Sequence, residues 1–227
     1  ESYLFFNNAQ FYALRFGYQY GLQNGKHLFG LSVPFVHNVF NEDLQGYENT
    51  SGLGDIRMSY MAGLTNGNSL GWTRVSPYLE VSAPTGEYLL GRGAGAWVYK
   101  PGIIFTYTPD PAISFYPEVR YQFSGGDANT TGDSGVPDPD DPEKDQSIHN
   151  LTIQLPVVLQ LESARSWVSL NAWYSQAFAV DEYYIYLRTD VGTMLGDRTS
   201  AALHLSKFIA GQARLNVIVQ AKFMFFL

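Results

Sequence analysis

Apolar and polar residues alternate along most of this chain with a period of two. The clearest stretch is residues 113–123, in which every odd-numbered residue is apolar or aromatic and most even-numbered residues are polar. Successive side chains of a β-strand point to opposite faces, so this pattern predicts a strand with one apolar face and one polar face. A tilted strand of about 9–11 residues with an apolar outer face is the unit of a membrane-spanning β-barrel.

The same alternation recurs along the chain and predicts ten further strands, with boundaries good to a few residues. The Asn24-Gly25 pair between the first two of these strands is a strong hairpin signal, because both residues tolerate positive φ. Residues 1–6 supply one more strand, which makes the number even, as in single-chain bacterial barrels. The predicted strands besides 113–123 and 1–6 are residues 11–22, 27–40, 55–64, 75–85, 98–108, 149–162, 167–178, 183–195, 200–209 and 213–227.

The connections between these strands fall into a short set and a long set. Outer-membrane barrels have short periplasmic turns and longer extracellular loops, so this division predicts an up-and-down antiparallel barrel of 12 strands. We expect one barrel domain over residues 1–227, with residues 124–147 as a long acidic extracellular loop. The short connections are residues 23–26, 65–72, 109–112, 163–166 and 196–199, and the long ones are residues 41–53, 86–96 and 124–147.

Composition supports this fold class and excludes others. No run of 18 apolar residues is present, so no helix is expected to span a bilayer. The 16 Tyr, 15 Phe and 4 Trp residues suit the aromatic girdles of an outer-membrane barrel. The net charge of −7 argues against a nucleic-acid partner, which requires a basic surface. A soluble β-sandwich or a lipocalin-like binder remains as another all-β interpretation.

The end of the chain carries a further signal. Alternate apolar residues finish with Phe223, Phe225 and Leu227, which resembles the assembly signal of outer-membrane barrels, although a terminal Phe is more usual there. We therefore expect the bacterial outer membrane as the location, with its lipid and lipopolysaccharide as the surroundings.

Two short motifs carry a family resemblance. One is Gly52-Leu53-Gly54-Asp55, and the other is Ala83-Pro84-Thr85-Gly86, followed by a glycine-rich loop and Lys100-Pro101-Gly102. Together they resemble the meta-pathway phenol-degradation-like family of outer-membrane barrels, which are regarded as transporters. The resemblance implies an outer-membrane barrel linked to the uptake of aromatic or other apolar compounds, and it implies no catalytic residue. The glycine-rich loop itself lacks the ending of a phosphate-binding loop, and we interpret it as a flexible loop that folds inward as a constriction.

The polar strand faces should point into the barrel, because an Arg or Lys facing lipid near the midplane costs about 2–4 kcal/mol. Mixed charge in a narrow lumen suits a constricted polar path for a solute, and equally an ionic core that only holds the barrel closed. The aromatic members of the set offer a stacking surface. The predicted lumen-lining residues are Arg15, Arg57, Tyr78, Glu80, Lys100, Tyr116, Glu118, Arg120, Gln154, Trp173, Arg188 and Lys222.

Two other groups of residues are candidate sites. Asp138, Asp140 and Asp141 lie in the acidic loop and are weak Ca²⁺ candidates, because Ca²⁺ takes carboxylate ligands, but a solvated loop explains them as well. Otherwise we expect no cofactor. His204 and Ser206 share a strand face, as a barrel-wall lipid hydrolase requires. Leu203 and Leu205 occupy the lipid side, however, so we expect no enzyme and keep a lipid hydrolase only as an alternative.

These features predict passive passage of a small, apolar or aromatic solute through an outer-membrane barrel. The alternative is a barrel that transports nothing and serves as a structural or interaction partner in an envelope protein assembly. Solute-swelling or conductance measurements separate the two functions, since the second predicts a barrel closed to every solute.

Overall fold

The computed structural model describes residues 2–5, 9–23, 26–40, 49–64, 72–125, 148–161, 165–178, 181–212 and 217–225. Within these ranges the chain is antiparallel β-sheet with one short 3₁₀ turn, η1 (Tyr88–Leu90). The described residues include no helix that is long and apolar enough to cross a membrane. The strands are β1 (Ser2–Phe5), β2 (Ala9–Leu22), β3 (His27–Phe40), β4 (Thr50–Leu53), β5 (Arg57–Ala62), β6 (Trp72–Ser82), β7 (Trp97–Asp110), β8 (Ile113–Phe115), β9 (Glu118–Gly125), β10 (His149–Leu161), β11 (Ser166–Ala177), β12 (Glu182–Gly196), β13 (Thr199–Gly211) and β14 (Val217–Phe225).

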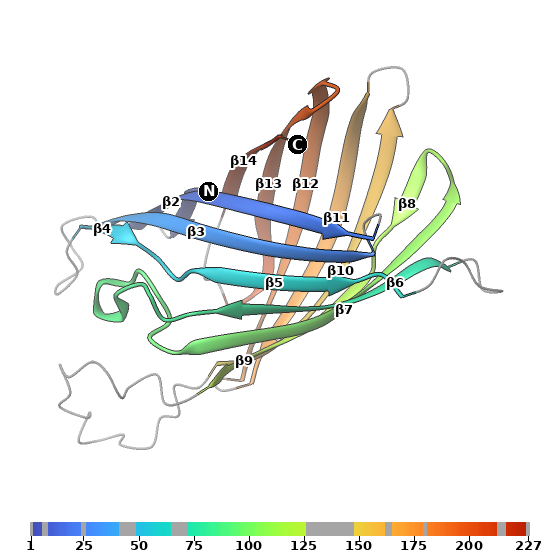
Figure 1. The fold of residues 1–227 in the computed structure, drawn as a ribbon. Coiled ribbons are helices and arrows are strands. Elements are labelled where there is room, and N and C mark those ends of the chain that lie inside the picture. Colours follow the sequence, from blue (N-terminus) through green and yellow to red (C-terminus); the bar gives the residue numbers. More distant parts are fainter. Residues whose placement is uncertain are drawn as a thin grey trace.

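The sheet closes on itself. Each strand pairs with its neighbours in chain order, and the first strand β1 pairs with both β2 and the last strand β14. β4 and β5 both pair with β3, while β8 and β9 both pair with β7 and β10, so each of these two pairs is one barrel strand with a break. Counted in this way, the described residues form a ring of twelve strands, as the sequence predicted (Figure 1).

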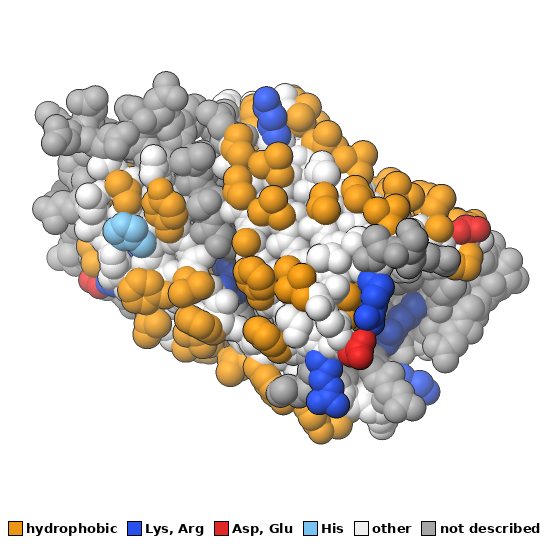
Figure 2. All heavy atoms as spheres, turned by 90° about the horizontal axis from the view of Figure 1, so that it is seen from above, with side chains coloured by type: hydrophobic (Ala, Val, Ile, Leu, Met, Phe, Trp, Pro, Cys, Tyr) orange, Lys and Arg blue, Asp and Glu red, His pale blue; other side chains and the backbone are white. Residues whose placement is uncertain are grey.

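Burial in this sheet is inverted relative to a soluble protein. The most deeply buried side chains are those of Asn38, Ser175 and Ser200, whereas Phe16 is 66% exposed. Val119 and Leu155 also lie on the exposed face, and their neighbour Glu118 is buried. In Figure 2 hydrophobic side chains spread over the outer surface, and most of the visible charged side chains lie toward one end. An apolar outside around a polar inside is the arrangement of a transmembrane barrel in the bacterial outer membrane.

Aromatic side chains gather near both ends of this apolar surface. At the end with the short turns, Tyr60 stacks on His27, with ring centroids 6.1 Å apart. At the end with the long connections, Tyr12 stacks on His37 and Tyr121 donates or accepts a 3.0 Å hydrogen bond with Nδ1 of His149. Rings with one polar atom favour the boundary between hydrocarbon and water, so these two groups mark the membrane interfaces.

Two predicted strands are interrupted rather than continuous. The stretch 113–123 breaks at Tyr116-Pro117, where proline lacks the N–H that a ladder needs, and pairing resumes at Glu118. The strand expected over residues 55–64 instead begins at Thr50, within a stretch that the pattern assigned to a loop, and breaks between Leu53 and Arg57. The second break matters most, because it places Asp55 outside the ladder.

Candidate functional site

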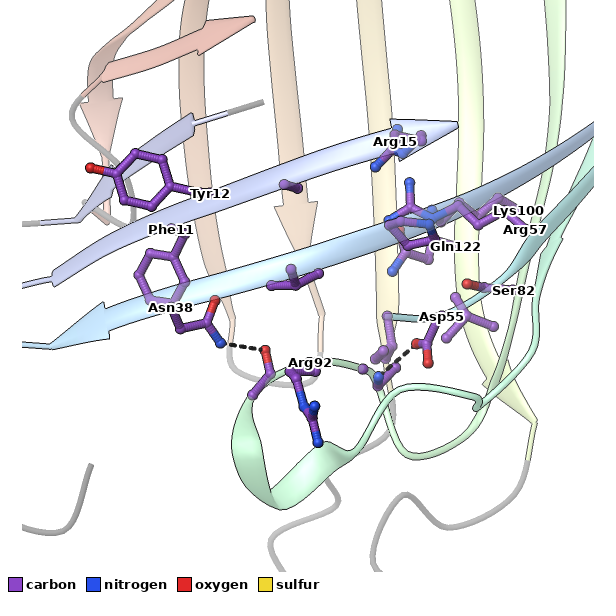
Figure 3. Close-up of a pocket in the computed structure, with 18 residues that line it drawn as sticks. Phe11, Tyr12, Arg15, Asn38, Asp55, Arg57, Ser82, Arg92, Lys100 and Gln122 are labelled. Carbon is purple, nitrogen blue, oxygen red and sulfur yellow. Dashed lines mark hydrogen bonds between the residues drawn. The ribbon is translucent and has the colours of Figure 1, made fainter. Parts of the chain in front are cut away.

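A cavity of about 450 Å³ lies inside the barrel, toward the end with the long connections. One side of it is the inner face of β2 and β3, with Phe11, Ala13, Pro34 and Val36, and another is the connection between β6 and β7 (Figure 3). Volumes of this size are typical of sites for small organic molecules. The full lining is Phe11, Tyr12, Ala13, Arg15, Pro34, Val36, Asn38, Asp55, Arg57, Ser82, Gly91, Arg92, Gly93, Ala94, Val98, Lys100, Gln122 and Ile148.

Residues 83–96 form an inward-folded loop, which we call the inner loop. The buried amide of Asn38 on β3 donates to the carbonyl oxygen of Gly91 at 3.1 Å, and Arg92 donates to the carbonyl oxygen of Ser51 at 2.6 Å. Arg92 also pairs with Glu87 within the loop. Asn38 points to the inside of the barrel, so these bonds place the inner loop against the inner surface of β3 and β4 (Figure 3).

Asp55 lies in the break between β4 and β5, and its side chain forms hydrogen bonds with both ends of the inner loop. Its side chain is only 8% exposed. Oδ1 accepts a hydrogen bond from the backbone N–H of Gly86 at 2.9 Å, and Oδ2 accepts one from the N–H of Ala94 at 2.7 Å. Hydrogen bonds to a charged group contribute about 1.5–3 kcal/mol each, so this carboxylate is a strong anchor for the loop.

The two family-like motifs meet at this anchor. Thr85 donates to the carbonyl oxygen of Gly54 at 3.0 Å, and its hydroxyl accepts the N–H of Ile56 at 2.9 Å. A Cβ on Gly86 would lie 2.4 Å from the backbone oxygen of Arg92 and 3.0 Å from the Cα of Gly54. The short motifs around Gly54 and Gly86 are therefore explained by close backbone approach at one place in the fold.

Three positive side chains line the cavity next to the inner loop. Arg15 from β2, Arg57 from β5 and Lys100 from β7 line the cavity, and Figure 3 shows their ends coming together near Gln122. Nζ of Lys100 donates to Glu80 at 2.8 Å. The buried Nε of Arg57 has no hydrogen-bond partner among the described residues.

A second inward network joins residues of β6, β9, β10 and β11, and it spans five barrel strands because β7 lies between β6 and β9. Glu118 is buried and accepts hydrogen bonds from Tyr78 on β6 and from Gln154 on β10. Gln154 in turn accepts from the amide of Asn171 on β11 at 2.9 Å. Arg120 lies 3.7 Å from the Glu118 carboxylate. These contacts fill part of the lumen with paired polar groups.

A third group lies on β11–β13. Asp190 accepts hydrogen bonds from Nε of Arg188 at 2.6 Å and from Ser169 at 2.7 Å, and Nδ1 of His204 lies 2.6 Å from it. The acidic partner of His204 therefore comes from β12. The group faces the lumen, since Leu203 and Leu205, on either side of His204, are exposed on the outer face of β13. A membrane lipid contacts the outer face of the barrel, whereas His204 and Asp190 lie on the inner face.

The predicted lumen residues lie on the inner side in different groups. Arg15, Arg57 and Lys100 line the cavity, and Tyr78, Glu80, Glu118, Arg120 and Gln154 belong to the adjoining networks. Arg188 and Lys222 lie on the wall formed by β12–β14, and Trp173 packs against Tyr184 and Tyr186 at centroid distances of 6.2 and 5.5 Å. Tyr116 lies in the break between β8 and β9 and lines no part of the cavity.

Sequence reasoning missed Asp55, Asn38 and Arg92 as site residues. The motif around Asp55 was noticed, but its partners lie 31 and 39 residues away, and alternation carries no information about them. The Ca²⁺ candidates Asp138, Asp140 and Asp141 lie outside the described residues, and within the described ranges no group of three or more metal-ligating side chains occurs.

Comparison with known proteins decides the family. Residues 7–180 match the model of the family described as "Putative MetA-pathway of phenol degradation". The chain belongs to this family. The resemblance inferred from the Gly54-Asp55 and Thr85-Gly86 motifs is thereby confirmed, and no relative is found among the curated proteins.

Two solved structures share the fold. The crystal structure of an outer-membrane channel from Pseudomonas putida F1 has a TM-score of 0.72 and 13% sequence identity, covering 95% of this chain and 82% of that one. The NanC porin has a TM-score of 0.63 and 10% identity, covering 97% of this chain and 94% of the porin. At these identities the likeness establishes the fold, an antiparallel β-barrel, and identifies no solute for this chain.

Proposed function

We propose that this barrel is a passive channel for a small organic acid, a solute with an apolar or aromatic body and a carboxylate group. The observation that carries the proposal is the cavity of about 450 Å³, which has apolar residues on one side and Arg15, Arg57 and Lys100 on another. The sequence suggested only the apolar or aromatic part of such a solute. The grouped cations in the cavity are the reason for adding the acid.

The charge on the inner wall supports an anionic solute. Although the chain has a net charge of −7, the inner faces of the described strands have more positive than negative residues between the rims. Positive groups along a pore with low-dielectric walls raise the local concentration of anions and are typical of anion pores. On the strands, the inward positive residues are Arg15, Arg57, Arg74, Lys100, Arg120, Arg188 and Lys222, and the inward acids between the rims are Glu80, Glu118 and Asp190. Asp55, in the break between β4 and β5, is a further acid that lines the cavity.

The acids near the cavity already have partners in the protein. Glu80 accepts from Lys100, Asp55 accepts from two backbone N–H groups, and Glu118 accepts from Tyr78. The Nε of Arg57, by contrast, is buried without a partner in the described part of the chain. The Arg57 side chain also lines the cavity. A guanidinium binds a carboxylate through two parallel hydrogen bonds, so Arg57 is the residue with which an acid in the cavity would pair.

The apolar lining favours an organic acid over an inorganic anion. Phe11, Val36 and Val98 offer a surface that a small hydrated ion would leave uncovered. The apolar ring of an organic acid would be removed from water against this surface, while its carboxylate would remain next to Arg15, Arg57 and Lys100.

Planar-bilayer recordings test the proposal with three probes of one shape: benzoate, neutral benzamide and benzylammonium. We expect an anion-selective conductance that benzoate interrupts more strongly than the other two probes do. Arg57→Gln should weaken the effect of benzoate about tenfold, since it removes one charge-assisted bidentate pair. Lys222→Gln is the matched control, because it removes an inward charge that does not line the cavity.

The outcomes separate the candidate functions. Equal responses to benzoate and benzamide would contradict the proposal that the solute is an acid. Equal effects of Arg57→Gln and Lys222→Gln would mean that the positive charge of the lumen as a whole, and not a site at Arg57, attracts the anion. A folded barrel that is closed to every ion and probe would instead favour the structural or interaction partner, because the paired network around Glu118 and Gln154 would then act as a filled core.

A further inference from the structure

We infer that Asp55 is a positioning residue that holds the inner loop, residues 83–96, inside the lumen and so sets the width of the solute path at the cavity. This inference rests on the proposed channel function, since a width matters only if a solute passes. It assigns to Asp55 a role at the channel that acts through the inner loop, which the Asp55 carboxylate holds in place.

The first observation is the unusual situation of the Asp55 carboxylate. It is buried, and among the described residues no Lys or Arg lies within 4.0 Å of it. Burying a carboxylate without a cation is costly unless hydrogen bonds replace its water. Here both replacements come from the backbone N–H groups of Gly86 and Ala94, so the cost is offset only while the inner loop is in place.

The second observation is the position of these two N–H groups in the chain. Gly86 lies just after β6 and Ala94 lies just before β7, so one carboxylate binds both ends of the inner loop. A single side chain thereby restricts the whole segment between them, including the 3₁₀ turn Tyr88–Leu90. The other loop bonds each act on one part of it: those of Asn38 and Arg92 hold its middle, and those of Thr85 hold its start.

The third observation is tight packing around the anchor. A Cβ on Gly93 would lie 2.4 Å from Oδ1 of Asp55 and 2.8 Å from the backbone oxygen of Gly86. Glycine at position 93 therefore lets the loop backbone reach the carboxylate. Since Gly91, Arg92, Gly93 and Ala94 all line the cavity, movement of this segment changes the space that is open to a solute.

Asp55→Asn tests the role with little change in shape, because the amide replaces one of the two acceptor oxygens with a donor. Gly93→Ala disturbs the same contact without changing any charge. The control is Asp197→Asn, which removes an acid from an exposed turn, where Asp197 pairs with Arg165 at 2.9 Å. Two quantities are measured in each protein: amide hydrogen exchange of residues 86–94 and single-channel conductance.

We expect exchange in the inner loop to accelerate roughly tenfold to a hundredfold in Asp55→Asn, as the loss of a charge-assisted bond predicts. Gly93→Ala should act in the same direction, and both variants should conduct more current than the wild type and Asp197→Asn. The barrel ladder is untouched, so the thermal unfolding midpoint should stay near that of the wild type.

Unchanged exchange in both variants would overturn the inference, and so would faster exchange with unchanged conductance. If conductance changed in Asp55→Asn and not in Gly93→Ala, the lost charge of Asp55, and not movement of the inner loop, would explain the change, and the inference would be wrong. If the wild-type barrel carries no current, the channel function fails and this role at the path fails with it, and hydrogen exchange still reports whether Asp55 holds the loop.

Discussion

Phe16→Arg is the sharpest test of the orientation on which the membrane assignment depends. Phe16 lies near the middle of β2, faces outward between the exposed residues Leu14 and Tyr18, and is 66% exposed. If this face meets acyl chains, the substitution places a guanidinium close to the bilayer midplane.

The expected cost follows from depth. An Arg near the midplane of a barrel's lipid face costs about 2–4 kcal/mol, which corresponds to a decrease in the folding equilibrium constant of roughly 30-fold to 700-fold. Gln19→Arg adds the same charge three residues away on the inner face of β2, where the original side chain is polar and exposed to the lumen. It should change the free energy of unfolding by less than about 1 kcal/mol.

Reversible urea unfolding from phospholipid vesicles measures the difference. Phe16→Arg should lower the midpoint without changing the slope with denaturant, because the surface exposed on unfolding stays the same. Equal destabilisation by Phe16→Arg and Gln19→Arg, or none by either, would mean that both faces meet a similar medium. The transmembrane barrel would then be wrong for this chain.

Two further predictions concern the lumen. Gly102→Val should displace Tyr78, whose ring carbon Cζ lies 2.4 Å from the position that a Cβ would take, and should break the bond from Tyr78 to Glu118. We expect a lower thermal midpoint and a changed conductance, and a crystal structure with Tyr78 in its original place would contradict this. His204→Ala should leave phospholipid vesicles as intact as the wild type does, because His204 faces away from lipid; loss of a measurable lipase activity on this substitution would revive the hydrolase.

The sequence by itself determined the strands, their faces and their number. Alternation is a local property, so residues such as Leu14, Phe16 and Leu155 identify the outer face without any knowledge of their neighbours. The inward direction of Arg57, Glu118 and Arg188 follows from the same rule, since each lies out of phase with the apolar set. The alternation of short and long connections predicted twelve strands. The structure agrees with this number, because the ring closed by β1 and β14 contains twelve barrel strands.

Only the tertiary structure decided which inward residues meet. Arg15 and Lys100 are 85 positions apart in the numbering and reach one cavity because barrel closure brings β2 and β7 around the same space. Asp55 lies in the break between β4 and β5, where the pattern predicted the start of a strand. Its partners are backbone N–H groups, which no side-chain pattern encodes. Periodicity fixes the side of the wall on which a residue lies, whereas contacts across the lumen depend on register and on how the inner loop folds back.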